Sequence, residues 1–156
     1  MFGIGLIELT LTAPIHAGHL KMIQAAAQLG DVVVVLNSDA WLKFKKGYVF
    51  MPYEERAYLL QHIKGVSQVS AVADSDGTVC EALRRLGPDM FGNGGDRTSE
   101  NTPETEICEE LGIAMVWKLG GSKIQSSRGL INTLFANKPT HSELDDFKRI
   151  LEKLPT

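Results

Sequence analysis

The chain has 156 residues, of which 44% are hydrophobic and 22% charged, a normal globular composition and a length for one domain with a sizeable core. Its net charge of −3 argues against a nucleic-acid coat or a binder of anionic membranes. No apolar run is long enough to cross a membrane.

Short β-branched runs alternate along the chain with segments of helical periodicity. The run 32–37, "VVVVLN", is apolar almost throughout, as expected for a strand buried on both faces. Strands are predicted over residues 5–12, 32–37, 66–72, 89–93 and 113–119.

The segments between these strands predict helices with recognisable ends. The first helix has an inward-facing apolar stripe formed by Leu20, Ile23 and Ala27. Prolines in first turns and glycines beyond last turns mark the helix ends. These markers are Gly30 after the first helix, Pro52 and Gly65, Gly87 with Pro88, and Pro103 with Gly112.

Strands that alternate with helices predict a parallel sheet with helices on both faces. The expected fold class is therefore α/β, a Rossmann-like five-stranded parallel sheet. Residues 139–155 predict an additional amphipathic C-terminal helix, in which Thr140 and Glu143 form a capping box. We expect one domain over residues 1–131 and a helical extension over 132–156, docked on the sheet or on the second subunit of a homodimer.

Location is predicted from the start of the chain and its two cysteines. The start, "MFGIGLIELTLT", lacks the basic flank of a signal peptide. Cys80 and Cys108 lie far apart in segments with helical patterns, which favours reduced core thiols over a disulfide or a zinc site. The expectation is a soluble cytoplasmic protein.

The segment "TLTAPIHAGH" joins the first strand to the first helix, the kind of place where open α/β sheets bind ligands. His16 and His19 are three residues apart and should face the same way, into the crevice. Gly18 would let a ligand approach the backbone, and the helix start favours an anion. Spacing alone leaves open whether they donate to a phosphoryl oxygen or are unrelated surface histidines. A zinc site lacks an obvious third ligand, since His62 and His141 are the only other histidines.

"HAGH" resembles the H-x-G-H signature of the nucleotidylyltransferase superfamily, in particular its cytidylyltransferase-like branch. Four further blocks are similar, in order and spacing, to blocks of glycerol-phosphate, ethanolamine-phosphate and heptose-phosphate nucleotidylyltransferases: "LGDVVVVLNSDAWLKFKKG", "MPYEERAYLL", "LRRLGPDMFGNGGDR" and "KIQSSRGLI". The resemblance covers roughly residues 5 to 131. It implies an enzyme that joins a nucleoside triphosphate to a phosphorylated alcohol or sugar and releases pyrophosphate.

The resemblance implies catalytic roles for four residues. His16 and His19 would stabilise charge on the α-phosphate while the acceptor's phosphate oxygen attacks in line. Lys45 and Lys46, expected on the loop after the second strand, would bridge the triphosphate and the incoming phosphate. A solvated lysine run is the structural alternative for "KFKKG".

The nucleotide-binding residues implied by the resemblance come from several blocks. Arg56 would grip phosphate, or it is a solvated arginine on a helix surface. Gly94 would permit close approach of the nucleotide and Asp96 would take ribose hydroxyls or position a metal; an ordinary glycine turn is the alternative. Ser126 and Ser127 would cap the last helix or, with Arg128 nearby, hold the β- and γ-phosphates at its start. The remaining members of the predicted set are Thr10, Leu11, Thr12, His16, Gly18 and His19.

Some positions depart from the family pattern. The families usually carry G-x-F-D ahead of H-x-G-H, where this chain has Thr10, Leu11, Thr12 and Ala13. Small residues keep room for phosphate, and backbone N–H groups can make the contacts of such a turn. Lys123 stands near the place of an absent arginine, and Asn93 stands where sugar-phosphate enzymes often have lysine. Both changes fall where the acceptor would bind.

The predicted function is nucleotidylyl transfer to a small phosphorylated metabolite, with CTP favoured over ATP. Mg²⁺ is expected to neutralise the triphosphate through its phosphate oxygens, with no direct protein ligand. Neither nucleic acid nor a membrane is expected as a partner. An ATP-dependent adenylyltransferase of the pantetheine-phosphate kind and a catalytically weak nucleotide-binding regulator are the alternatives. No G-x-G-x-x-G motif follows the first strand, which argues against a nicotinamide enzyme.

Overall fold

The computed structural model describes residues 3–9, 15–95, 97–121 and 126–136, and residues 140, 142, 145, 146, 148 and 149 of the C-terminal segment. Five strands form one parallel sheet in the order β3-β2-β1-β4-β5. They are β1 (Gly3–Leu9), β2 (Gly30–Leu36), β3 (Val66–Ala71), β4 (Met90–Gly94) and β5 (Ala114–Leu119). The predicted α/β class with a Rossmann-like parallel arrangement is confirmed.

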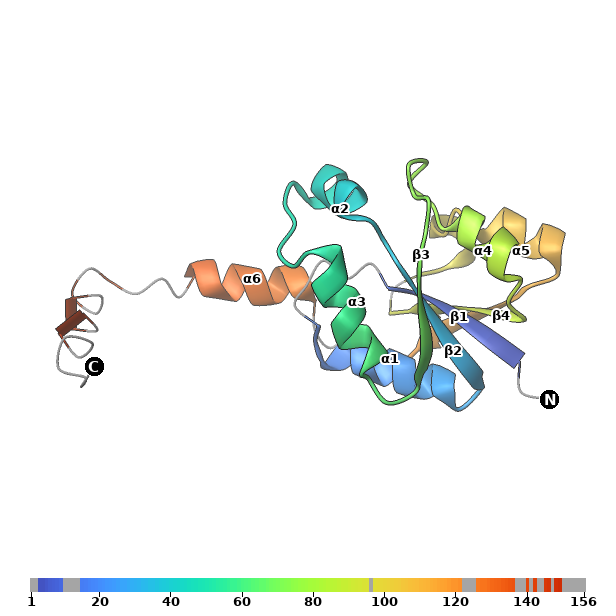
Figure 1. Cartoon of the computed structure of the whole chain (residues 1–156), viewed down its shortest axis with the longest axis horizontal. Helices are drawn as coiled ribbons and strands as arrows, with labels where there is room; N and C mark the ends of the chain where they lie inside the picture. Colours follow the sequence, from blue (N-terminus) through green and yellow to red (C-terminus); the bar gives the residue numbers. More distant parts are fainter. Residues whose placement is uncertain are drawn as a thin grey trace.

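Helices cover both faces of the sheet. They are α1 (Ala17–Ala27), α2 (Asp39–Lys46), α3 (Tyr53–Gln61), α4 (Cys80–Leu86), α5 (Thr105–Leu111) and α6 (Ser127–Ala136), with a short 3₁₀ helix, η1, at Ser99–Asn101. Figure 1 shows α1 and α3 on one side of the sheet, α4 and α5 on the other, and α6 leading away from it. Residues 142, 145, 146, 148 and 149 are helical, but the rest of the expected C-terminal helix lies outside the described residues, so that helix stays a prediction.

The core consists of two apolar layers that share β2. Val32, Val34 and Leu36 pack with α1 and α3, whereas Val33 and Val35 pack with α4 and α5. All five side chains are buried, which confirms the prediction that this strand is covered on both faces. The two layers hold the carboxyl ends of the strands at one common edge.

Several helix ends differ from the predictions. Gly30 is the first residue of β2, and α1 ends at Ala27 with Gln28 as its C-cap. Leu20, predicted to face inward, is 38% exposed, because the buried stripe of α1 is formed by Met22, Ile23 and Ala26. Gly87 and Gly112 do end α4 and α5, each in the left-handed conformation that glycine adopts without strain.

Candidate functional site

The start of α1 is built by the two histidines themselves. His16 is the N-cap residue, with an extended backbone, and its Nδ1 accepts the N–H of Gly18 at 3.1 Å. His19 lies one turn further on, and its Nδ1 accepts the N–H of His16 at 3.3 Å. Each histidine therefore satisfies a backbone donor that the helix start leaves unpaired, which is the hydrogen-bond pattern of a capping box.

This reciprocal capping fixes the tautomers of both rings. A backbone N–H can only donate, so both Nδ1 atoms act as acceptors and a neutral ring must carry its proton on Nε2. The rings stack with their centroids 3.8 Å apart, which confirms that His16 and His19 face the same way. Burial, and then the charge of His16, lower the pKa of His19 to about 4. Near pH 7 His19 is therefore a neutral Nε2–H donor.

Gly18 leaves room for the His16 ring in this turn. A Cβ atom at this position would lie 3.0 Å from Cε1 and Nδ1 of the His16 ring. The space beside Gly18 is thus filled by the capping imidazole, and the predicted approach of a ligand to its backbone stays a prediction. Glycine between the two histidines lets the first ring fold back over the helix start.

Glycines also bring α1 close to β4 and β5. A Cβ at Gly94 would collide with Sδ of Met22, and a Cβ at Gly120 would lie 2.7 Å from the backbone nitrogen of Met22. The absent side chain of Gly94 therefore serves helix-to-sheet packing, which the sequence had attributed to a nucleotide. Contact of its backbone with a nucleotide stays a prediction. Because Met22 is one turn beyond His19, these glycines set where the histidine pair lies relative to the sheet.

Lys45 and Lys46 lie in a different element from the one predicted. They form the last turn of α2 and not a loop. The helix begins after Ser38, whose Oγ accepts the N–H of Trp41, and it ends at Gly47, which has the left-handed conformation. Lys45 is exposed, with Nζ 5.9 Å from the centroid of the Trp41 ring. Their bridging of phosphates stays a prediction.

Arg56 is fully buried, so the alternative of a solvated surface arginine is wrong. Its guanidinium donates to the carbonyl oxygens of Met51 and Asn37, each at 2.9 Å, and forms an ion pair with Asp39. These bonds tie the end of β2 to the starts of α2 and α3. Arg56 is therefore a structural clamp in this structure, and its predicted grip on phosphate has no support from these contacts.

A second polar clamp, which the sequence did not reveal, is centred on Asp74 just after β3. Its carboxylate accepts from Ser38 N at 2.8 Å, Ser38 Oγ at 2.7 Å and Asn37 Nδ2 at 3.3 Å. Asp74 is 7% exposed. No motif marks this residue; only its place at the end of a strand next to β2 could have indicated it.

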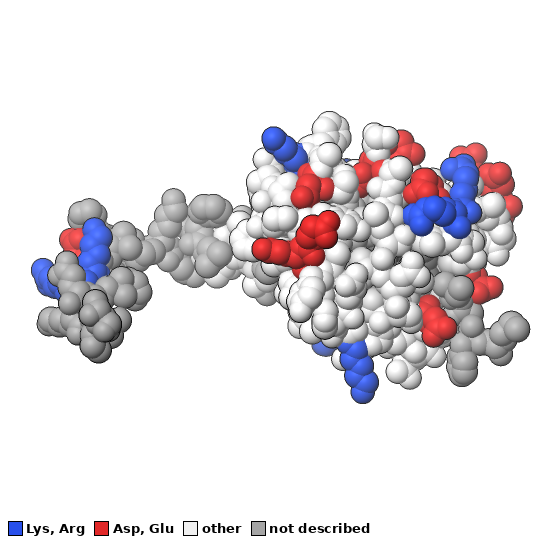
Figure 2. All heavy atoms as spheres, in the orientation of Figure 1, with Lys and Arg blue, Asp and Glu red and all other residues white. Residues whose placement is uncertain are grey.

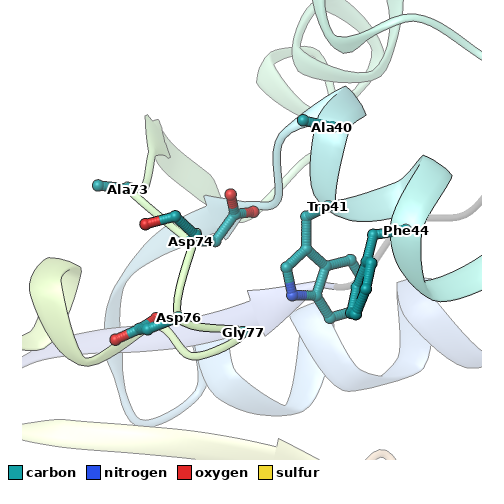
Figure 3. A pocket seen from close by; sticks show the side chains of 8 residues that line it. Ala40, Trp41, Phe44, Ala73, Asp74, Asp76 and Gly77 are labelled. Atoms are coloured by element: carbon teal, nitrogen blue, oxygen red, sulfur yellow. The ribbon is translucent and has the colours of Figure 1, made fainter.

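A pocket of about 560 Å³ opens beside this clamp, between α2 and the loop that follows β3. Trp41 and Phe44 form its wall on α2, and Asp74, Asp76 and Gly77 lie opposite (Figure 3). The two aromatic residues are three positions apart and so share one face of the helix. Phe44 is 89% exposed, which leaves a broad ring surface available to a ligand.

The start of α6 is capped by Ser126, whose Oγ accepts the N–H of Gly129 at 3.0 Å. The predicted capping role of Ser126 is confirmed. The side chains of Ser127 and Arg128 lie outside the described residues, as do Thr10, Leu11, Thr12, Ala13 and Asp96. Their predicted nucleotide contacts remain predictions.

Charged side chains are scattered on the visible surface. Figure 2 shows Lys and Arg separated by Asp and Glu on the face it presents. Across the described ranges, no three His, Cys, Asp or Glu side chains gather closely enough to hold a metal ion. Within the same part of the chain, no helix has the length and apolar character needed to cross a membrane.

Comparisons with known proteins bear on the same region. Bifunctional protein HldE of Nitratiruptor sp. is 36% identical over 100 residues, and that of Streptomyces coelicolor 39% over 101 residues. The alignments cover 62% and 63% of this chain but only 21% of each relative, so the chain spans about a fifth of their length.

A solved structure and a family model complete the comparison. The lipopolysaccharide core biosynthesis protein from Thermoplasma volcanium has a similar fold, with a TM-score of 0.61 and 19% identity over 74% of this chain and 96% of its own. The family model described as cytidylyltransferase-like matches residues 13–123, which include the histidine pair, both clamps and the pocket. The chain therefore belongs to the cytidylyltransferase-like family of nucleotidylyltransferases.

Proposed function

We propose that the protein transfers a nucleotidyl group from a nucleoside triphosphate, CTP in preference to ATP, to a small phosphorylated sugar or alcohol. An oxygen of the acceptor phosphate attacks the α-phosphorus, the bond from that phosphorus to the bridging oxygen of the β-phosphate breaks, and pyrophosphate leaves. No protein nucleophile is required.

The observation that carries this proposal is the reciprocal capping of His16 and His19. It supplies two adjacent Nε2–H donors at a helix start, where the dipole also favours negative charge. Donors held in place before the reaction stabilise charge that develops on the α-phosphate, because they need not reorganise. The lowered pKa of His19 fits hydrogen-bond donation by a neutral ring better than proton transfer.

The pocket at Trp41 and Phe44 is the proposed place for the acceptor's carbon skeleton. It lies at the carboxyl edge of β2 and β3, beside the strand that leads to the histidines. Neighbouring strands are about 4.8 Å apart, so a small phosphorylated metabolite can reach from this pocket to the end of β1. Asp74 and Asp76 would repel a phosphate, so the acceptor's phosphate should point away from them and towards α1.

Mg²⁺ is proposed to enter with the triphosphate, since this ion prefers phosphate oxygens and retained waters. When bound it neutralises charge on the phosphates. The protein's own part is then to orient the α-phosphate with the histidine pair and to hold the distal phosphates near the start of α6.

Pyrophosphate release tests the proposal directly. The purified protein is incubated with Mg²⁺, CTP or ATP, and single acceptors: sugar 1-phosphates, glycerol 3-phosphate, phosphoethanolamine and 4′-phosphopantetheine. We expect release with CTP and at least one sugar or polyol phosphate. Release only with ATP and 4′-phosphopantetheine would favour the adenylyltransferase alternative. Nucleotide binding without release from any pair would favour a regulator.

A further inference from the structure

A buried acid outside the histidine pair has an incomplete set of hydrogen bonds. Glu104, directly before α5, is 1% exposed. Its Oε1 accepts the N–H of Val79 at the start of α4, at 3.1 Å, but its buried Oε2 has no hydrogen-bond donor in the described part of the chain. A desolvated carboxylate oxygen without a donor costs free energy, so such an atom calls for a functional explanation.

The nearest described cation to this oxygen is Arg97. Its Nη1 lies 3.7 Å from Oε2, beyond the roughly 2.7–2.9 Å of a charge-assisted hydrogen bond, so the two attract each other through charge alone. The side chain of Glu104 is 2% exposed and that of Arg97 is 34% exposed. The carboxylate is thus fixed inside the protein, while the side chain of Arg97 is partly exposed.

Arg97 lies just after β4, near the carboxyl ends of the neighbouring strands β4 and β1. It is the third residue beyond β4, and its N–H bonds to the carbonyl oxygen of Gly94 at 3.4 Å. β4 pairs with β1, the strand that leads to His16. The chain leaves β1 for a helix on one face and β4 for a helix on the other, and open α/β sheets bind their ligands at such a point.

We propose that Arg97 binds a substrate phosphate at this edge of the sheet, and that Glu104 is the positioning residue that holds the guanidinium there. The planar fork of an arginine matches two phosphate oxygens, and a buried carboxylate behind it limits where the side chain can turn. The inference rests on the proposed function only for the identity of the substrates. The phosphate belongs either to the nucleotide or to the acceptor, and the two sources are separated by the experiment.

The test uses the full chain with Arg97→Gln, Arg97→Lys, Glu104→Gln and the double variant Arg97→Gln/Glu104→Gln. Arg84→Gln removes an exposed arginine of α4 and serves as the matched control. Calorimetry measures affinity for cytidine, CMP and CTP, and for adenosine, AMP and ATP. Steady-state assays measure KM for the best acceptor from the panel, and thermal unfolding measures Tm.

If the phosphate belongs to the nucleotide, Arg97→Gln should weaken triphosphate binding about tenfold and leave nucleoside binding unchanged. If it belongs to the acceptor, the acceptor KM should rise about tenfold and nucleotide affinity should stay. Arg97→Lys should recover part of the loss. Glu104→Gln should show the same selective effect, and the double variant should be no worse than Arg97→Gln alone, because Glu104 acts through Arg97.

Unchanged affinities and KM in Arg97→Gln would overturn the inference, as would equal losses for nucleoside and triphosphate. A fall in Tm for Glu104→Gln with no functional effect of Arg97→Gln would make the pair purely structural. Pyrophosphate release that is indifferent to Arg97 would leave the proposed function standing without this inference. A selective loss of triphosphate binding in Arg97→Gln, in a protein that releases no pyrophosphate, would support this inference and overturn the proposed function. A wild-type protein that binds neither nucleotide nor acceptor would end both.

Discussion

At the scale of single residues, His16 and His19 are held by the backbone of their own helix turn, since each Nδ1 accepts a backbone N–H there. The pairing of His16 and His19 followed from their spacing, because helix geometry places residues three apart on one face. The burial of Arg56 could not be predicted from the sequence, since it depends on contacts with Asn37 and Asp39, which lie outside its own helix. The reciprocal capping by the two histidines could not be predicted from the sequence either, because histidine is not among the usual N-cap residues.

Replacing His16 by Asn separates capping from catalysis. Asparagine is a good N-cap residue, so His16→Asn should keep Tm near the wild-type value, whereas His16→Ala should lose about 1 kcal/mol of stability. Both variants lack the Nε2–H donor and should lower turnover about 10²–10³-fold, with a much smaller loss of nucleotide affinity. Steady-state kinetics and thermal unfolding measure the two effects. Near-wild-type turnover in His16→Asn would make the ring purely structural.

The depressed pKa of His19 predicts a pH-dependent stability. Because the pKa falls from 6.5 in a free histidine to about 4 in the folded protein, the unfolded chain binds more protons between these values. The stabilising contribution of the neutral His19 ring is therefore fully present above pH 6.5 and is lost as the pH falls towards 4. The loss from pH 7 to pH 5 should be about 1–2 kcal/mol.

His19→Gln is the matched variant for this effect. Glutamine at the third helical position can still accept the N–H of residue 16, but it does not titrate. The difference in unfolding free energy between pH 7 and pH 5 should therefore be smaller in His19→Gln than in the wild type. Parallel pH dependences in urea titrations would refute the assignment to His19.

At the scale of elements, the strands and most helices could be predicted because buried β-branched runs and terminal glycines act locally. The helix α2 was missed: its sequence "DAWLKFKK" has only Leu42 buried, so the apolar periodicity that indicates a helix is weak. The close approach of α1 to β4 and β5 was missed as well, because it depends on which glycines meet Met22 in space.

Two adjacent glycines allow the close packing of α1 against the end of β5 to be tested. Gly120 and Gly121 both have left-handed backbones, at φ +79 and +82, but only a Cβ at Gly120 would meet the backbone of α1. Gly121→Ala should cost only the strain of that conformation, about 1–2 kcal/mol. Gly120→Ala should cost at least about 3 kcal/mol, and should lower turnover by displacing the histidine pair. Equal Tm values for the two variants would mean that α1 tolerates the added methyl group.

The start of α6 offers a second test at this scale. Ser126→Ala should lower stability by about 1 kcal/mol through loss of the cap to Gly129. If the same helix start also holds the distal phosphates, the variant Ser126→Ala/Ser127→Ala should weaken CTP binding and barely change CMP binding. Calorimetric titrations with both nucleotides measure this, and equal losses would reduce the serines to helix caps.

For the whole molecule, the parallel sheet and its two apolar layers follow from the α/β pattern and could be predicted from the sequence, whereas the strand order was not predicted. The pocket was not predicted either, because its wall at Phe44 belongs to α2 and the acids Asp74 and Asp76 belong to the loop after β3, and only the fold brings these segments together.

The predicted boundary at residue 131 falls within α6 (Ser127–Ala136), so the role of the extension is tested by ending the chain after that helix. A protein that ends after Ala136 retains the sheet and α1 to α6, so we expect its Tm to stay within about 3 °C of the full chain and its nucleotide affinity to be unchanged. Gel filtration of both proteins reports any role of the last twenty residues in self-association. Loss of cooperative unfolding on truncation would place those residues within the fold of the domain.

The mutual capping of the histidines also has a meaning for protein engineering. The four residues from His16 to His19 carry their own orientation, because each ring is aligned by the backbone of the other and by the glycine between them. A helix start grafted with this tetrapeptide would receive the two imidazole rings together with the backbone bonds that align them. Transplanting the pair alone, without the glycine or the helix start, would transfer two histidines and none of their alignment.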